Sequence, residues 1–223
     1  MPEYPHSEAL GQTRDLPAPS MRPNSFPSNP RRRSGLEDTI AAIADVLESR
    51  DSRIVQHQRR VGALAGAIAV EMGLPARRAR GIRLAGLVHD FGEIRIPPGL
   101  PSKTGGLAED EVAVEREHPR MGHDILKRVG FPRPIAEIVL QHHERMDGSG
   151  YPRALKGGEI LLEARIIAVA DVIEAMAFEQ DPRRPGQGIA VALAEVEARE
   201  GWYYDAAVVE AALRLFREKG FRF

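Results

Sequence analysis

The chain has 223 residues, of which 43% are hydrophobic, and this is enough for one buried core in one main domain. Its 31 basic and 32 acidic residues nearly cancel, which excludes a general electrostatic attraction to nucleic acid or to an anionic membrane. The absence of cysteine excludes disulfides, thiolate metal sites and cysteine nucleophiles, and leaves His, Asp and Glu as the available metal ligands.

The sequence has neither an apolar signal core at its N-terminus nor a charge-free apolar stretch long enough to cross a membrane. Its most apolar stretch, residues 166–178, carries Asp171 and Glu174. We therefore expect a cytoplasmic protein that binds neither nucleic acid nor membranes. Any anionic ligand must then be held by local charge or by metal.

Residues 1–33 contain seven of the 17 prolines and the basic run RRR, with few apolar residues. Such a segment cannot bury enough surface to offset its chain entropy, so we expect a disordered tail. The basic run is a solvated linker end or, as the less favoured alternative, a contact for acidic partners or nucleic acid.

The folded domain is expected to cover residues 34–223 and to begin with a helix. The residues from Ser34 to Glu37 fit a capping box, and apolar residues recur at helical spacing from Leu36 onward. This first helix is also a candidate face for a homodimer.

A second helix is predicted over residues 52–72, because apolar residues repeat there at helical spacing with His57 among them. A lone histidine on a buried stripe is more often a core residue bonded to a carbonyl than a metal ligand. A third helix is predicted to open at Pro75 and to carry His89 and Asp90 at its end.

Histidines also mark the ends of later predicted helices. After a loop rich in proline and glycine, an acidic helix is predicted to end at His118, and a short helix that ends at Gly130 follows it. An apolar helix over residues 134–141 then leads to the adjacent His142 and His143. His142 shares one face with the apolar residues of that helix, so it points toward the core.

One long helix is predicted over residues 159–176, with Asp171 inside its apolar stretch. A carboxylate buried there without a partner would be costly, so it needs either a nearby cation or an arginine such as Arg165. Two further amphipathic helices are predicted over residues 188–199 and 205–219. No segment alternates like a strand, so the predicted fold class is all-α.

The residues after the apolar helix form the string HHERMDGSGYP, from His142 to Pro152. Its glycines are free to take positive φ, and its proline forbids helical geometry at the preceding residue. The string closely resembles the signature of the HD-GYP family, and the earlier His-Asp doublet matches the one that names the HD phosphohydrolase superfamily. The resemblance covers roughly Leu36 to Phe223 and implies an HD-domain helical bundle with a GYP loop.

The resemblance also implies a metal centre. Seven residues match the family's metal-ligand positions: His57, His89, Asp90, His118, His142, His143 and Asp171. Such a set of nitrogen and carboxylate donors suits two divalent transition-metal ions, Fe or Mn, better than structural zinc or an all-oxygen site. Asp90 would bridge the ions. Some family members hold a third ion through a Glu whose position is Arg53 here, so we expect a dinuclear site.

The function implied by the resemblance is hydrolysis of cyclic di-GMP to pGpG or GMP in bacterial second-messenger signalling. Two ions about 3.5–4 Å apart can activate a water for in-line displacement at phosphorus. The resemblance thus makes the chain a metal-dependent phosphodiesterase with His89 and Asp90 at its catalytic centre. The GYP loop would shape the rim of the substrate pocket through Arg145, Asp147 and Tyr151, and would present a surface to signalling protein partners.

The chain departs from the family pattern where the substrate's phosphate would be held. The usual HDxGK is HDFGE here, so Glu93 replaces a lysine that faces phosphate. In the segment that usually ends in RPYR, Gln180 replaces the first arginine, or Asp181 does if one residue is inserted. The second arginine is kept as Arg183 or Arg184.

Losing one charge-assisted phosphate contact costs on the order of 1.5–3 kcal/mol, so we expect a weakened substrate clamp and weak activity. Two alternatives to cyclic di-GMP hydrolysis therefore stay open. One is a non-catalytic signalling module that binds nucleotide or a protein partner. The other is an HD hydrolase of another phosphoester.

Overall fold

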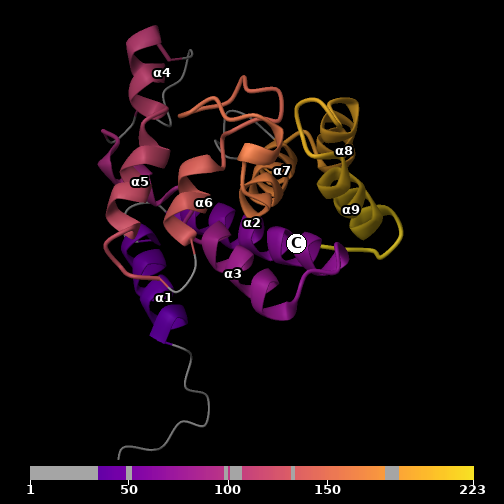
Figure 1. The fold of residues 1–223 in the computed structure, drawn as a ribbon, viewed down its shortest axis with the longest axis horizontal. Helices are drawn as coiled ribbons and strands as arrows, with labels where there is room; N and C mark the ends of the chain where they lie inside the picture. Colours follow the sequence, from indigo (N-terminus) through magenta and orange to yellow (C-terminus); the bar gives the residue numbers. More distant parts are fainter. Residues whose placement is uncertain (1–34, 49–51, 98–99, 101–106, 132–133, 179–185) are drawn as a thin grey trace, which may run out of the picture. The chain divides into compact units, whose positions relative to one another are not determined.

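The computed structural model describes residues 35–48, 52–97, 100, 107–131, 134–178 and 186–223. Over these residues every regular element is helical (Figure 1), which confirms the predicted all-α class. The α-helices are α1 (Gly35–Glu48), α2 (Ser52–Glu71), α3 (Ala76–Gly86), α4 (Glu109–Glu115), α5 (His118–Leu126), α6 (Ile135–Gln141), α7 (Leu162–Ala177), α8 (Ile189–Ala198) and α9 (Ala206–Arg217). Two short 3₁₀ helices are η1 (Phe91–Arg95) and η2 (Gly157–Glu159). The tail expected at residues 1–33 lies outside the described residues.

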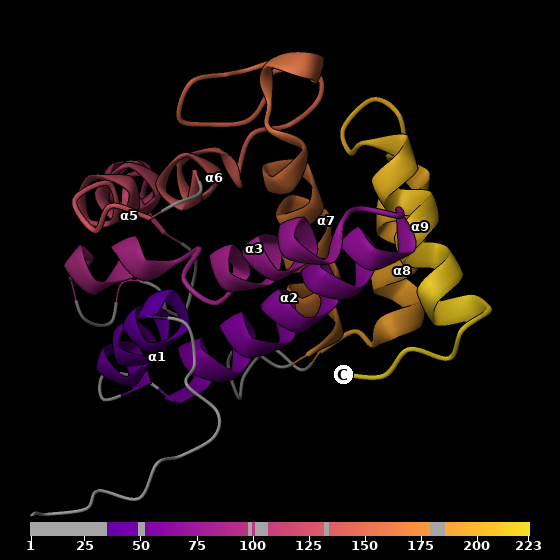
Figure 2. The same ribbon diagram turned by 60° about the horizontal axis from the view of Figure 1, so that its bottom comes forward.

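Helix α2 packs against both α3 and α7. Figure 2 shows α2 and α3 side by side, with α5 and α6 toward one end of this pair and α8 and α9 toward the other. Two glycines let α2 and α3 touch, because a Cβ on Gly86 would lie 2.7 Å from the Cα of Gly62. This close crossing brings His57 of α2 near the turn that follows α3.

Aliphatic side chains from most of the helices form the core. The largest fully buried ones are Ile40, Leu64, Ile68, Ile82, Ile96, Leu126, Ile135, Ile160, Ile166, Ile167 and Ile173. Each stabilises the fold by about 1.5–3 kcal/mol relative to an exposed side chain. None of the described helices is long and apolar enough to cross a membrane.

The structure corrects three predicted boundaries. Helix α3 ends at Gly86, so the His-Asp doublet lies on the turn before η1 instead of on a helix. His118 begins a helix instead of ending one, because Pro119 suits the first turn of α5. Helix α7 begins at Leu162 instead of residue 159, because Ile160 is extended and buried.

Candidate metal centre

The seven candidate ligands come from five parts of the fold and converge. They are His57 on α2, His89 and Asp90 on the turn after α3, His118 at the start of α5, His142 and His143 directly after α6, and Asp171 on α7. Their donor atoms include two groups in which all atoms lie within 4.8 Å of one another. Both groups contain Asp90.

Asp90 lies between two sets of histidines. Its Oδ1 is 3.3 Å from Nε2 of His142 and 3.4 Å from Nε2 of His118. Its Oδ2 is 2.9 Å from Nε2 of His89 and 3.4 Å from Nε2 of His57. One carboxylate oxygen thus faces each set, which is the arrangement that a carboxylate bridging two ions requires.

The second carboxylate of the cluster is Asp171. Its Oδ1 lies 3.3 Å from Nε2 of His57 and 3.7 Å from Nε2 of His89. Arg165, the alternative partner for Asp171, instead donates to Asp205 at 2.9 Å and to the carbonyl of Ile160. The structure therefore leaves Asp171 facing histidines, as a metal ligand would.

Three of the histidines share one backbone contact that orients their rings. Nδ1 of His89, His118 and His142 lies 2.9, 2.7 and 2.6 Å from the carbonyl oxygen of the residue three positions earlier. A carbonyl only accepts hydrogen bonds, so Nδ1 carries the proton and Nε2 faces the cluster. Support of this kind fixes the ring that binds a metal.

The Nε2 atoms lie so close together that a shared cation is the natural account. Nε2 of His118 is 3.3 Å from Nε2 of His142 and 3.1 Å from Nε2 of His143. A single proton can lie between only one of these pairs, whereas one metal ion can bind all three nitrogens. Nε2 of His89 is buried without a hydrogen-bond partner, although a carboxylate oxygen lies 2.9 Å away. The donor set therefore fits divalent transition-metal ions.

The two histidines after α6 are uncharged, which is the form of imidazole that binds metal. Burial lowers the pKa of His142 and lowers the pKa of His143 well below its usual value, and the nearby His118 adds to both effects. Both rings therefore stay uncharged at pH 7, with lone pairs that can bind a cation.

The histidines nearest the carboxylates hold protons when no metal is bound. Burial would lower the pKa of His57 and His89, but contacts with Asp90 and Asp171 outweigh it and raise both, that of His89 to about 10. Burial would likewise raise the pKa of both carboxyls, but the histidines outweigh it and hold them well below their usual range. Protons and metal ions therefore compete for the same nitrogens.

We expect metal uptake to release protons. Metal affinity should therefore decrease as the pH is lowered. His57 and His89 must each lose the second ring proton that the nearby carboxylates stabilise, so the apparent Kd for Mn²⁺ should rise at least about tenfold from about pH 8 to about pH 6. Competition with a fluorescent chelator at constant ionic strength measures this change. An affinity that stays constant over the range would contradict the histidine ligand set.

Two residues beyond the seven ligands support His57. Nδ1 of His57 lies in short contact with one oxygen of the fully buried Glu174, and Nε of Arg60 donates to the other oxygen at 2.5 Å. Neither residue has a role that its sequence pattern predicted. The available signal was a second carboxylate in the same apolar stretch, three residues after Asp171.

Gly92, in the HDFGE segment, brings two ligand-bearing elements together. A Cβ at this position would lie 1.8 Å from the carbonyl oxygen of His118, so only glycine lets η1 lie directly against α5. This approach brings His118 within reach of Asp90.

Gly92→Ala should therefore lose most of its metal and destabilise the fold by about 3 kcal/mol or more, because backbone must move to admit the methyl group. Gly158→Ala is the matched control, since a Cβ there meets nothing within 4 Å. Metal analysis and thermal melting of both variants measure the effect. Full metal content in a folded Gly92→Ala would show that the close approach is not needed.

Glu144 holds the loop that follows α6. Its buried carboxylate accepts hydrogen bonds from the backbone N–H of Arg153 at 2.7 Å and of Leu155 at 3.0 Å. Gly150 packs against the backbone at Glu144 and His143, since a Cβ on Gly150 would lie 2.5 Å from the carbonyl oxygen of His143. The glycine and the glutamate of the signature thus fold the loop back over the ligand histidines.

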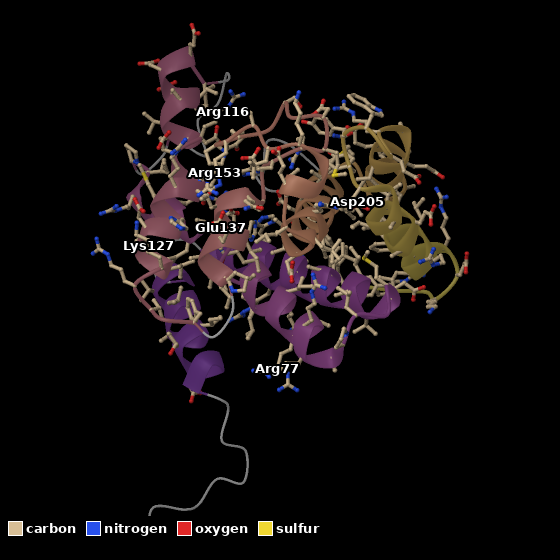
Figure 3. The ribbon with its side chains drawn as sticks, in the orientation of Figure 1. Arg77, Arg116, Lys127, Glu137, Arg153 and Asp205 are labelled. Carbon is tan, nitrogen blue, oxygen red and sulfur yellow. The ribbon has the colours of Figure 1, made fainter. Side chains whose placement is uncertain are left out.

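Tyr151 is the loop residue that lies against a candidate ligand. Its ring packs on His143 with centroids 4.8 Å apart, and the guanidinium carbon of Arg116 lies 5.3 Å from its centroid. Burial raises the pKa of Tyr151, so its hydroxyl stays protonated as a donor. Figure 3 labels Arg116 and, near it, Arg153, which pairs with Glu137 of α6 at 2.6 Å. No sequence pattern singled out Arg116.

The other two expected loop residues make local contacts. The guanidinium carbon of Arg145 lies 5.3 Å from the ring centroid of Tyr203, and its Nη1 donates to backbone carbonyls. Asp147 is exposed and accepts from the backbone N–H of Ser149 at 2.9 Å. Both residues therefore shape the loop itself.

Glu93, in η1, is half-buried beside the ligands. Burial, together with the negative charge of Asp90, raises the pKa of Glu93 to about 7, while the charges of nearby ligand histidines oppose the rise. The Glu93 carboxyl thus lies close enough to the candidate ligands for their charges to change its pKa. Arg53 is exposed on α2. The remaining residues of the expected phosphate clamp lie outside the described part of the chain: Gln180, Asp181, Arg183 and Arg184.

The family model of the HD domain matches residues 41–208. The chain is 40% identical over 179 residues to the cyclic di-GMP phosphodiesterase response regulator RpfG of Xanthomonas campestris pv. campestris, covering 79% of this chain and 47% of that protein. It is 39% identical over 188 residues to a cyclic di-GMP phosphodiesterase of Thermotoga maritima, covering 82% and 51%. The chain thus spans about half the length of these curated relatives.

Two solved structures share the fold. Bd1817, an HDG"Y"P protein from Bdellovibrio bacteriovorus, superposes with a TM-score of 0.62 at 17% identity, covering 82% of this chain and 63% of that chain. The HD domain of the phosphodiesterase PgpH from L. monocytogenes, in complex with cyclic-di-AMP, gives a TM-score of 0.55 at 17% identity, covering 82% and 100%. Because the family model spans most of the sequence and the fold agrees, the chain belongs to the HD domain family, as its HD-GYP resemblance predicted.

Proposed function

We propose that the chain is a metal-dependent phosphodiesterase of cyclic dinucleotides and that cyclic di-GMP is its substrate. The observation that carries the proposal is the convergence of five imidazole nitrogens on two carboxylates, in contacts that a shared cation satisfies. Relatives 39–40% identical to the chain are cyclic di-GMP phosphodiesterases, which supports the choice of substrate.

We propose that two divalent ions, iron or manganese, are held on either side of Asp90. His57, His89 and Asp171 would hold one ion, and the other would be held by His118, His142 and His143. Bound ions of this kind lower the pKa of a coordinated water and stabilise charge on phosphoryl oxygens.

The chain's own residues would bind and orient the substrate around this centre. The protonated hydroxyl of Tyr151 is a hydrogen-bond donor beside His143, and Arg116 places positive charge over the same ring. Arg145 and Asp147 would act indirectly, by fixing the shape of the loop. Arg183 and Arg184 stay proposed contacts for phosphate.

The direct test is turnover by metal-loaded protein. Protein reconstituted with Fe²⁺ or Mn²⁺ without oxygen is incubated with cyclic di-GMP, and the products are separated by chromatography. We expect pGpG first and GMP on longer incubation. Parallel reactions with 3'3'-cGAMP and cyclic di-AMP are needed, because a relative from Vibrio cholerae at 34% identity is a 3'3'-cGAMP-specific phosphodiesterase. Faster turnover of either competitor would refute the choice of cyclic di-GMP.

A second candidate, a signalling module that binds nucleotide without hydrolysing it, is favoured by Glu93. An ionised carboxyl beside the centre repels the phosphates that the reaction must stabilise. Metal-loaded protein that binds cyclic di-GMP with no turnover of any of the three dinucleotides would establish this alternative.

A further inference from the structure

One cavity contains none of the candidate metal ligands. It has a volume of about 440 Å³ and lies between α2, the end of α7, the start of α8 and the chain after α9. Figure 2 shows that the chain after α9 turns back toward α2. The lining residues are Arg60, Phe178, Ile189, Phe216, Phe221, Arg222 and Phe223.

The apolar wall of the cavity is aromatic. Phe178 and Phe223 meet edge to face with centroids 5.0 Å apart, and Phe216 and Phe221 do the same at 5.2 Å. Small-molecule sites have volumes of about 300–1,000 Å³ and are lined mainly by apolar and aromatic side chains with a few polar groups. The size and lining suit a flat ligand of about two fused rings.

The polar side chains among the described lining residues are both cationic. Arg60 and Arg222 contribute guanidinium groups, and none of the described lining residues is acidic. The guanidinium carbon of Arg60 lies 4.3 Å from the ring centroid of Phe178, and its side chain is 25% exposed. Its Nε bonds Glu174, and no hydrogen bond among the described residues uses its terminal nitrogens. Such a wall complements an anionic group on an aromatic ring.

Arg60 also connects the cavity to the metal centre. It donates to one oxygen of Glu174, whose other oxygen contacts Nδ1 of His57. Nε2 of His57 lies 3.3 Å from Asp171 and 3.4 Å from Asp90. The cavity wall is therefore linked to the candidate ligand His57 through two contacts, Arg60 to Glu174 and Glu174 to His57.

We propose that this cavity binds a small aromatic carboxylate, with its rings among the phenylalanines and its carboxylate on Arg60 and Arg222, and that the site is coupled to the metal centre through Glu174 and His57. Cations at the centre attract an anion on Arg60, so each ligand strengthens the binding of the other. The coupling is reciprocal, because the total free energy of binding both ligands does not depend on which one binds first.

Isothermal titration calorimetry with 2-naphthoate tests the proposal, and 2-naphthamide serves as the uncharged molecule of the same shape. We expect 2-naphthoate to bind metal-free protein and to bind Mn²⁺-loaded protein at least about fivefold more tightly. Because 2-naphthamide lacks the charge-assisted contacts, its Kd should be at least about tenfold higher than that of 2-naphthoate. Equal affinity for the two compounds would overturn the anion site, and equal affinity with and without Mn²⁺ would overturn the coupling.

Variants separate this cavity from the metal centre. Ile189→Trp fills the cavity and should abolish binding, while Arg222→Gln should weaken it about tenfold. Val191→Trp is the matched control, because Val191 lies on the same helix, is 44% exposed and does not line the cavity. Binding retained by folded Ile189→Trp, or by Arg222→Gln at full strength, would overturn the proposal. Binding only in the presence of Mn²⁺ would also overturn it, because the carboxylate would then bind metal.

Discussion

Asp90→Ala is expected to lose most of the bound metal and to lower turnover of cyclic di-GMP at least about 1,000-fold, equivalent to ~4 kcal/mol of transition-state stabilisation. Asp90 faces both sets of histidines, with its two oxygens 2.9–3.4 Å from four different Nε2 atoms. Its removal takes away the one group common to both proposed ions.

Metal analysis and the turnover assay, performed on the same preparation, measure this prediction. Asp124→Ala is the control, because Asp124 is exposed on α5 and its partners are Lys127 at 2.5 Å and His123 at 3.5 Å, neither of which is a candidate ligand. It should keep both metal and activity. If Asp90→Ala retains two ions per chain and normal turnover, Asp90 does not bridge a catalytic centre.

Glu93→Lys is expected to raise kcat/KM for cyclic di-GMP at least about tenfold, or by ~1.4 kcal/mol. Glu93 is half-buried in η1, one turn after Asp90, so its carboxylate would lie beside the phosphate that the ions would hold. Lysine replaces this repulsion with attraction. Coordination of the phosphate by the ions would explain why the unchanged chain keeps weak activity despite the repulsion from Glu93.

Glu93→Gln divides this effect into two steps, since it removes the negative charge without adding a positive one. Cations bound at the centre would keep the Glu93 carboxyl ionised, so Glu93→Gln should raise kcat/KM, by a smaller factor than Glu93→Lys. Glu210→Lys, the same change at an exposed position of α9, should leave kcat/KM unchanged. An unchanged or lower kcat/KM in Glu93→Lys with full metal content would show that Glu93 does not face the substrate.

Helical periodicity predicted most of the helices because each amphipathic stripe is a local property of the sequence. The predicted segments at 188–199 and 205–219 lie within two residues of α8 and α9. The turn that carries His89 and Asp90 could not be predicted in this way. Helix α3 ends at the point where Gly86 touches α2, and that contact depends on a residue 24 positions earlier, Gly62.

The candidate ligands could be identified because the HD doublet and the HHERMDGSGYP string are short, local patterns. The residues that support them could not, since the contact between Glu174 and His57 spans 117 positions and that between Arg60 and Glu174 spans 114. The alternative between a cation and Arg165 as the partner of Asp171 likewise depended on the fold. Arg165 pairs with Asp205, 40 positions later.

Anomalous X-ray scattering from crystals of Mn²⁺-loaded protein tests the dinuclear centre most directly. Two peaks about 3.5–4 Å apart are expected, with Asp90 between them. One peak should lie nearest His57, His89 and Asp171, and the other nearest His118, His142 and His143. Peaks elsewhere in the molecule, or a cluster of seven side chains without any bound metal, would contradict the account.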